Sequence, residues 1–192
     1  MEALRQAIEE MGSGIGTDIV KVDRFLNHRI DTGLLFRMGE ALADHFAKAK
    51  PALVLTIEAS GIALATATAH ALGDIPLVFA KKSAALNQSS VMAQAEVYSF
   101  TRKQACFVRV DLKYIPLGSR VLIIDDFLAD GQAVQGMRSL IEQAGAELVG
   151  VGVAIEKGFQ QGGRKLRESG VNLLSLAVVE AIQDGHILCK DC

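Results

Sequence analysis

The chain has few of the features that mark membrane, secreted or nucleic-acid-binding proteins. None of its apolar runs reaches the roughly 18 residues that a membrane-spanning helix needs. It has three cysteines, an odd number that argues against a disulfide framework, and a net charge of −2, which gives no basis for binding nucleic acid. The first ten residues predict an amphipathic helix and not a signal peptide. We therefore expect a cytoplasmic protein that binds neither membranes nor nucleic acids.

Aromatic residues and proline are also scarce. Aromatic residues make up 5% of the chain, and there are 3 prolines among 192 residues, while half of the residues are hydrophobic. Aliphatic side chains must therefore dominate the core. The 18 glycines suit an α/β protein with short turns better than a disordered chain. A chain of this length fits one domain, which we expect to span residues 1–192.

Apolar runs and amphipathic stretches alternate along most of the chain. The pattern predicts helices from Asp31 or Thr32 to about residue 47, over 62–72 and over 132–144, the last ended by Gly145. Predicted strands cover residues 52–57, 76–80, 121–124, 148–156 and 173–179. Such alternation implies an α/β fold whose mainly parallel sheet is flanked by helices.

Three segments fall outside this alternation. Residues 81–95 are polar and without clear periodicity, which predicts a long loop. Two strands, over 96–101 and 105–110, follow it and suggest a hairpin or flap. The segments before Asp31 and after Val179 are expected to form a small cap, or hood, over the core.

Residues 121–133, with the sequence VLIIDDFLADGQA, form the most informative segment. An apolar run of four residues indicates a strand buried on both faces, and Asp125 and Asp126 end it abruptly. Ligands of open α/β sheets bind beyond the carboxyl ends of strands. Gly131 permits a tight turn before a helix, whose first amides can bind a phosphate, while carboxylates accept hydrogen bonds from sugar hydroxyls. The segment thus suits a ribose phosphate, although an ordinary strand end followed by an Asp-Gly turn is the alternative.

This segment resembles the phosphoribosyl pyrophosphate motif of type I phosphoribosyltransferases, in a variant whose loop lacks threonine. Residues 21–28, 57–62, 97–101 and 155–160 also match that family, so the resemblance covers most of the chain. Asp130 departs from it, because Asn is common at this position in the variant resembled. The resemblance implies the fold described above, a homodimer, and the transfer of a phosphoribosyl group to a purine.

The resemblance also assigns roles to individual residues. It implies catalytic roles for two residues, Asp125 and Asp126. The residues implied to bind phosphoribosyl pyrophosphate are Ala129, Asp130, Gly131, Gln132, Ala133, Lys81, Ser60, Tyr98 and Ser99, and those implied to bind the base, expected to be xanthine, are Val20, Asn27 and Lys157. Mg²⁺ is expected to bind mainly through the pyrophosphate substrate, without a dedicated protein metal site.

Plainer interpretations stand beside these roles. Ser60 can be a helix N-cap, Lys81 and Lys82 a solvated pair, and Glu156 and Lys157 a surface charge pair at a strand end. Within enzymes the base can also be hypoxanthine, guanine or adenine, and a regulatory protein can keep the sugar-phosphate site without catalysis. The C-terminal pair Cys189 and Cys192 offers potential metal ligands, but too few for a structural zinc site.

Overall fold

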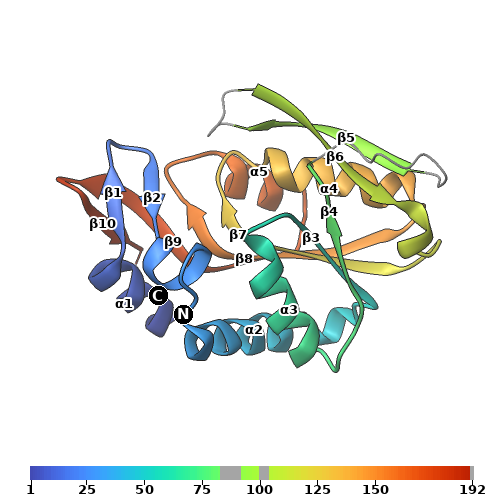
Figure 1. Cartoon of the computed structure of the whole chain (residues 1–192), viewed down its shortest axis with the longest axis horizontal. Helices are drawn as coiled ribbons and strands as arrows, with labels where there is room; N and C mark the ends of the chain where they lie inside the picture. The colour runs from blue at the N-terminus through green and yellow to red at the C-terminus, as the bar shows by residue number, and fades with distance from the viewer. Residues whose placement is uncertain (83–91, 100–103, 191–192) are drawn as a thin grey trace.

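Five parallel strands and one antiparallel strand form the central sheet (Figure 1). The computed structural model describes residues 1–82, 92–99 and 104–190. In the order β10-β9-β8-β7-β3-β4 the strands are β10 (His186–Cys189), β9 (Leu173–Gln183), β8 (Glu147–Lys157), β7 (Arg120–Leu128), β3 (Leu53–Ile57) and β4 (Leu77–Ala80). β10 is the antiparallel strand at one edge. The predicted mainly parallel sheet is confirmed.

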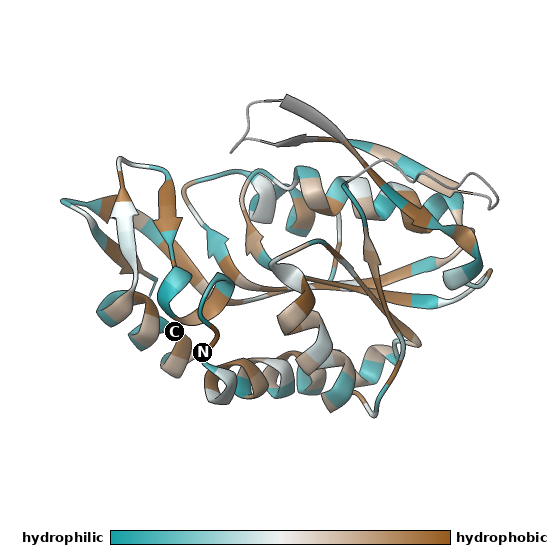
Figure 2. Ribbon diagram, viewed as in Figure 1, coloured by the Kyte–Doolittle hydropathy of each residue, from teal (hydrophilic) through white to brown (hydrophobic). Residues whose placement is uncertain are grey.

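Helices cover both faces of this sheet. On one face lie α2 (Thr32–Phe46) and α3 (Gly61–Ala71), and on the other α4 (Gln132–Gln143) and α5 (Gly162–Glu168) (Figure 1). Successive residues of β7 alternate between the two cores, since Leu122 and Ile124 pack with α2 and α3, whereas Val121 and Ile123 pack with α4. This double burial explains why the strand has an unbroken apolar run. In Figure 2, hydrophobic residues, drawn in brown, recur along the central strands.

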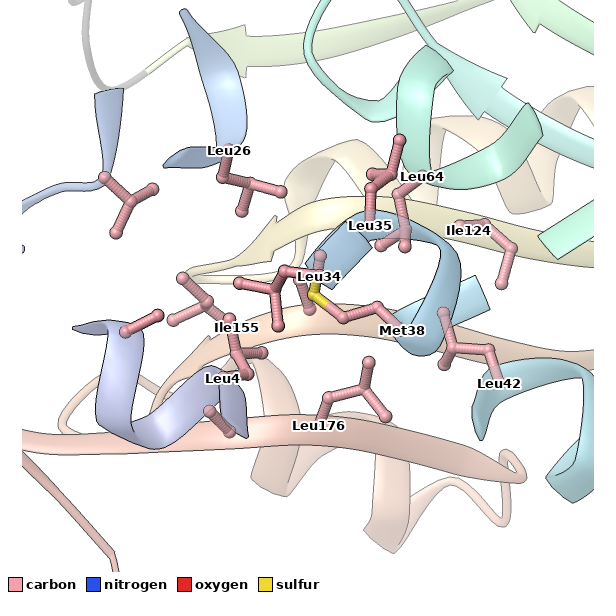
Figure 3. Close-up of a cluster of buried hydrophobic side chains, with 14 of the residues drawn as sticks. Leu4, Leu26, Leu34, Leu35, Met38, Leu42, Leu64, Ile124, Ile155 and Leu176 are labelled. Carbon is pink, nitrogen blue, oxygen red and sulfur yellow. The ribbon is translucent and has the colours of Figure 1, made fainter. Parts of the chain in front are cut away.

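The N-terminal segment forms the expected hood together with β10. It consists of α1 (Glu2–Met11), the hairpin of β1 (Ser13–Ile15) and β2 (Ile19–Lys21), and the π-helix η1 (Asp23–Asn27). α1 contacts β9 and β10 near the two chain ends (Figure 1). One apolar cluster joins Leu4 and Leu26 of the hood to Leu34 of α2, Ile155 of β8 and Leu176 of β9 (Figure 3). The hood is therefore continuous with the core beneath it.

A second hairpin, of β5 (Met92–Ser99) and β6 (Gln104–Asp111), lies over α4. The prediction of a loop through residue 95 is wrong at its end, because β5 begins at Met92. Ala93, Ala95 and Val97 face inward and are buried, while the residues between them are exposed. Alanine is a weak strand former, so this alternation is faint in the sequence. Residues 83–91 of the predicted loop lie outside the described residues.

The predicted helix ends agree with the structure, and four short helices were not predicted. The Asp31 carboxylate accepts a hydrogen bond of 2.9 Å from the Leu34 amide at the start of α2. Gly145, with φ of 64°, follows the end of α4. The unpredicted helices are η1, η2 (Ala47–Ala49), η3 (Leu112–Tyr114) and α5. The longest of them, α5, has 7 residues and is too short for a periodic pattern. None of the helices in the described ranges is long and apolar enough to cross a membrane.

Two glycines of α2 allow a matched test of this packing. A Cβ atom on Gly39 would lie 2.7 Å from the carbonyl carbon of Ala67 on α3, whereas one on Gly33 would meet nothing closer than 3.5 Å. Gly39→Ala should lower the free energy of unfolding by about 1–3 kcal/mol, because the helices must separate. Gly33→Ala should raise it by roughly 0.5–1 kcal/mol through higher helix propensity. Denaturant unfolding measures both, and equal effects would contradict the close helix contact.

Candidate active site

The two acidic residues lie inside β7 and not beyond its end. β3 pairs with β7 as far as Leu55, opposite Ile123, whereas β8 stays paired with β7 to Leu128. The prediction that the strand ends at residue 124 is therefore wrong. Asp125 and Asp126 are 5% and 6% exposed. The apolar pattern stops at these residues, but the pairing with β8 continues past them.

Asp125 sits in a tight and electrostatically unfavourable position. Its Oδ1 accepts a hydrogen bond of 2.9 Å from the Asp126 amide. Burial, followed by the neighbouring charge of Asp126, raises the pKa of the Asp125 carboxyl well above its ordinary value, and the charge of Lys82 opposes this rise. Asp125 therefore retains a proton to higher pH than a solvated aspartate does.

The start of α3 approaches Asp125 very closely. A Cβ atom on Gly61 would lie 2.6 Å from the Asp125 Oδ1 and 2.4 Å from the Thr56 Oγ1. The Thr56 hydroxyl is fully buried and has no hydrogen-bond partner within the part of the chain that the structure describes. Glycine is therefore required at position 61 for α3 to pack here. Sequence analysis missed Thr56, because a threonine within an apolar strand gives no functional signal.

The β3–α3 loop precedes Gly61, which lies next to Asp125, and also contacts the end of β4. Its Glu58–Ala59 peptide bond is cis. The Glu58 carboxylate accepts a hydrogen bond of 2.7 Å from the Lys82 amide, which joins this loop to the end of β4. Ser60 is exposed at the N-cap position of α3, but its side chain makes no capping hydrogen bond. Ser60 therefore occupies the N-cap position of the alternative interpretation, without the hydrogen bond from its side chain.

Residues 129–133, which we call the β7–α4 loop, turn sharply into α4. Gly131 has φ of 89°, a conformation that suits glycine, and immediately precedes the helix. The Asp130 carboxylate turns into the loop and accepts a hydrogen bond of 3.2 Å from the Gln132 amide. Gln132 is exposed, whereas Ala129 and Ala133 are half-buried. The predicted turn at the start of a helix is thus present.

The two lysines after β4 have different surroundings. Lys81 pairs with Arg109 of β6 through two backbone hydrogen bonds, and its Nζ lies 5.9 Å from the centre of the Phe79 ring. The charge of the next residue, Lys82, acts on Asp125. The Lys-Lys pair in the sequence does not show which of the two charges acts on Asp125, so the prediction names Lys81 and not Lys82.

Tyr98 and Ser99 stand at the end of β5. Their side chains lie outside the described residues, so the expected contact of these two residues with pyrophosphate stays a prediction.

The residues expected to bind the base come from the hood and from β8. Val20 is buried in β2, and Asn27 is exposed at the end of η1. Lys157 ends β8, and its ammonium donates a hydrogen bond of 2.7 Å to the carbonyl of Asp18 in the β1–β2 turn. Burial lowers the pKa of Lys157, and the Asp18 carboxylate opposes that shift. The structure therefore brings Lys157 against the hood.

Glu156 does not form a surface pair with Lys157, so that alternative is wrong. Its carboxylate is 4% exposed and accepts two hydrogen bonds from the Arg167 guanidinium, at 2.8 and 2.6 Å, and one from Ser175 at 2.5 Å. Burial pushes the pKa of Glu156 upward, but the hydrogen bonds from Arg167 and Ser175 outweigh it, so that this pKa lies below its ordinary value. Consecutive strand residues point to opposite sides, which separates Glu156 from Lys157.

In the described residues, the protein side chains alone do not form a metal-binding site. Across ranges 1–82, 92–99 and 104–190, no group of three or more His, Cys, Asp or Glu side chains is placed to hold a metal ion. Cys189 is half-buried in β10, and Cys192 lies outside the described residues.

Comparison with known proteins identifies the family. The family model described as "Phosphoribosyl transferase domain" matches residues 29–174, which include β3, β7, the β7–α4 loop and β8. The chain belongs to the phosphoribosyltransferase family. Asp125 and Asp126 lie within the matched range.

Relatives of this phosphoribosyltransferase extend over nearly the whole chain. A xanthine phosphoribosyltransferase from Clostridioides difficile (strain 630) is 48% identical over 187 residues, covering 97% of this chain and 98% of the relative. Another, from Heliobacterium modesticaldum, is 47% identical over 188 residues and covers 98% and 99%. The crystal structure of an adenine phosphoribosyltransferase from Rhodothermus marinus DSM 4252 superposes with a TM-score of 0.74 at 27% identity, covering 93% and 97%. The expected type I fold with its hood is confirmed.

The raised pKa of Asp125 predicts how stability depends on pH. An unfolded aspartate titrates near pH 4, so below that pH the ionisation of Asp125 takes no stability from the folded protein. It loses stability as the pH rises through the higher folded pKa of Asp125. Asp125→Asn cannot ionise and should melt higher than the parent at pH 7 but not at pH 4, at about 2–4 °C for each kcal/mol gained.

Thermal melts of the ligand-free protein across this pH range measure the effect. Asp44→Asn, at an exposed position of α2, is the matched control and should follow the parent curve. A pH-independent difference between Asp125→Asn and the parent would contradict the electrostatic explanation.

Proposed function

We propose that this phosphoribosyltransferase joins xanthine to phosphoribosyl pyrophosphate and releases xanthosine 5′-monophosphate and pyrophosphate, a step of purine salvage. The observation that carries the proposal is the position of the buried Asp125–Asp126 pair directly before the β7–α4 loop, with Lys157 held against the hood nearby in the fold. The near full-length similarity to xanthine phosphoribosyltransferases supports the choice of base.

The acidic pair would act on the sugar. Ribose hydroxyls would donate hydrogen bonds to Asp125 and Asp126. When pyrophosphate leaves, the anomeric carbon gains positive character, and preorganised carboxylates stabilise such charge in a site that excludes water.

The phosphates would bind at loop amides. The β7–α4 loop precedes α4, so its backbone amides and the helix dipole would hold the 5′-phosphate. Asp130 already engages the Gln132 amide within this loop. For pyrophosphate we propose the loop with Ser60, together with Lys81, Tyr98 and Ser99, and we add Lys82 because of its charge near Asp125.

Magnesium fits this arrangement as a companion of the substrate. The buried carboxylates of Asp125 and Asp126 are oxygen donors, which Mg²⁺ prefers, but two adjacent acids do not form a complete cage. Mg²⁺ would therefore bind mainly through pyrophosphate oxygens, where it neutralises the charge of the leaving group.

The base would lie between the hood and the end of β8. The Asn27 amide can both donate and accept hydrogen bonds, which suits a purine edge, and Val20 would contribute its backbone. The Lys157 ammonium donates to oxygen, and xanthine carries a 2-oxo group that hypoxanthine lacks. Guanine has an amino donor at that position, which a lysine opposes.

Two other functions make different predictions in one assay. Pyrophosphate release is measured with phosphoribosyl pyrophosphate, Mg²⁺ and a panel of xanthine, hypoxanthine, guanine and adenine. Preference for another base would replace xanthine, and binding without turnover would favour a regulatory protein. We also propose that the protein is a single domain with a cytoplasmic location. We further propose a homodimer, and sedimentation of the purified protein would test this oligomeric state.

The acidic pair should be essential for turnover. The double variant Asp125→Asn/Asp126→Asn keeps side-chain size, and it should fold because buried charge is removed and not added. Its kcat should fall by about 10²-fold or more, as for other preorganised electrostatic groups. Steady-state kinetics at saturating substrates measures this, and a near-normal kcat would remove the pair from the mechanism.

Lys157 should select the base. Loss of a charged hydrogen bond in a closed site costs about 1.5–3 kcal/mol, so Lys157→Met should lower kcat/KM for xanthine roughly ten- to a hundredfold. Any activity with hypoxanthine should change much less. Lys48→Met, at an exposed position in η2, is the control and should leave both unchanged. Equal losses with both bases would mean that Lys157 does not choose the base.

A further inference from the structure

α5 joins the two proposed subsites through a pair of glycines. Gly162 and Gly163 open this helix, and both are buried. Each lies too close to a different neighbour to carry a side chain. Gly162 packs on the β7–α4 loop, and Gly163 packs on the ion pair between Glu156 and Arg167. The helix therefore lies between the phosphate loop on one side and the end of β8 on the other.

The contact of Gly162 with the loop involves backbone atoms. Its amide donates a hydrogen bond of 3.1 Å to the carbonyl of Ala129. A Cβ atom at position 162 would lie 2.4 Å from that oxygen and 2.7 Å from the Gly131 nitrogen. Backbone atoms cannot rotate away as a side chain can. The position of α5 therefore limits how closely the β7–α4 loop can approach this helix.

The ion pair holds α5 from the opposite side. A Cβ atom on Gly163 would lie 1.9 Å from the Glu156 Oε1, so the helix rests directly on this carboxylate. Arg167, in the last turn of α5, donates two hydrogen bonds to the Glu156 carboxylate, and Ser175 of β9 donates a third. The Glu156 carboxylate is buried, whereas the Arg167 side chain is 47% exposed. An ion pair of a buried carboxylate often adds little to stability, and its best-attested use is to specify one geometry.

We propose that Glu156 and Arg167 are positioning residues for the 5′-phosphate: their ion pair fixes α5, and Gly162 of α5 fixes the backbone amides of the β7–α4 loop. The inference rests on the proposed function, because it assumes that this loop binds the phosphate. Neither residue touches substrate. The effect should therefore appear in the affinity for the phosphate-bearing substrate and not in the affinity for xanthine.

A double variant separates positioning from stability. Arg167→Met alone leaves a buried carboxylate without its partner and destabilises the fold. Glu156→Gln/Arg167→Met removes both charges, and Ser175 can still donate to the new amide oxygen, so the melting temperature should recover relative to Arg167→Met. The dissociation constant for ribose 5-phosphate, measured by calorimetry, should nevertheless stay about tenfold above the parent value, a loss of roughly 1.4 kcal/mol in binding.

Kinetics supplies a second readout. KM for phosphoribosyl pyrophosphate should rise by about the same factor, whereas KM for xanthine should change less than about twofold. Arg167→Lys, which keeps the charge but loses the two-pronged contact, should give an intermediate effect. If affinity for ribose 5-phosphate recovers together with stability in the double variant, the ion pair is merely structural and the proposal is overturned.

A matched pair at the other end of the sheet is the control. Arg120 and Glu147 form an ion pair of 2.8 Å between the amino ends of β7 and β8, far along both strands from the loop. Arg120→Met/Glu147→Gln should leave the affinity for ribose 5-phosphate unchanged. An equal loss in this control would mean that any weakened ion pair between these elements disturbs binding, which also overturns the proposal.

Gly162→Ala tests the last link directly, since it keeps the ion pair and pushes the loop. It should weaken ribose 5-phosphate binding about tenfold or more, and unchanged binding would overturn the role of α5. The proposed function fails separately, if the parent protein neither binds ribose 5-phosphate nor releases pyrophosphate with any purine. If the parent does both and the variants behave like it, the positioning role alone is wrong.

Discussion

The site depends on the unequal lengths of neighbouring strands. β3 stops pairing with β7 at Leu55, while β7 continues beside β8 to Leu128. The acidic pair therefore occupies a part of β7 that is held firmly on one side and lacks the β3 partner on the other. The start of α3 fills that side so closely that residue 61 must be glycine. Carboxylates are thus placed on a rigid strand within the sheet and not on a loop, which favours the precise orientation that catalysis requires.

This placement has an electrostatic cost in the empty protein. Two adjacent carboxylates are almost excluded from water, and the raised pKa of Asp125 reflects the resulting penalty on the charged form. Ribose hydroxyls and Mg²⁺ accompanying the substrate would supply the missing hydrogen bonds and positive charge.

The sequence predicted the layers of the fold and the residues of the main motif, because both depend on local patterns. Unbroken apolar runs indicate doubly buried strands, and the Asp-Asp pair before a glycine turn indicates the loop. It did not predict that β7 runs through Asp125, since hydropathy stops where polar residues begin, whereas strand pairing depends on a partner distant in sequence. For the same reason the burial of Glu156 was missed. Arg167 pairs with this carboxylate and Ser175 donates a hydrogen bond to it, but both partners are distant in sequence.

The end of β8 shows how one strand can serve two subsites. Glu156 and Lys157 are consecutive, so their side chains leave the sheet in opposite directions, one to α5 and the other to the hood. β8 is paired on both sides here, with Leu128 opposite Glu156 on β7 and Val179 opposite Lys157 on β9. A shift of one residue would turn each side chain to the opposite face of the sheet and place a lysine against α5. The register of a single strand therefore fixes the positions of both the proposed base subsite and the support for the phosphate.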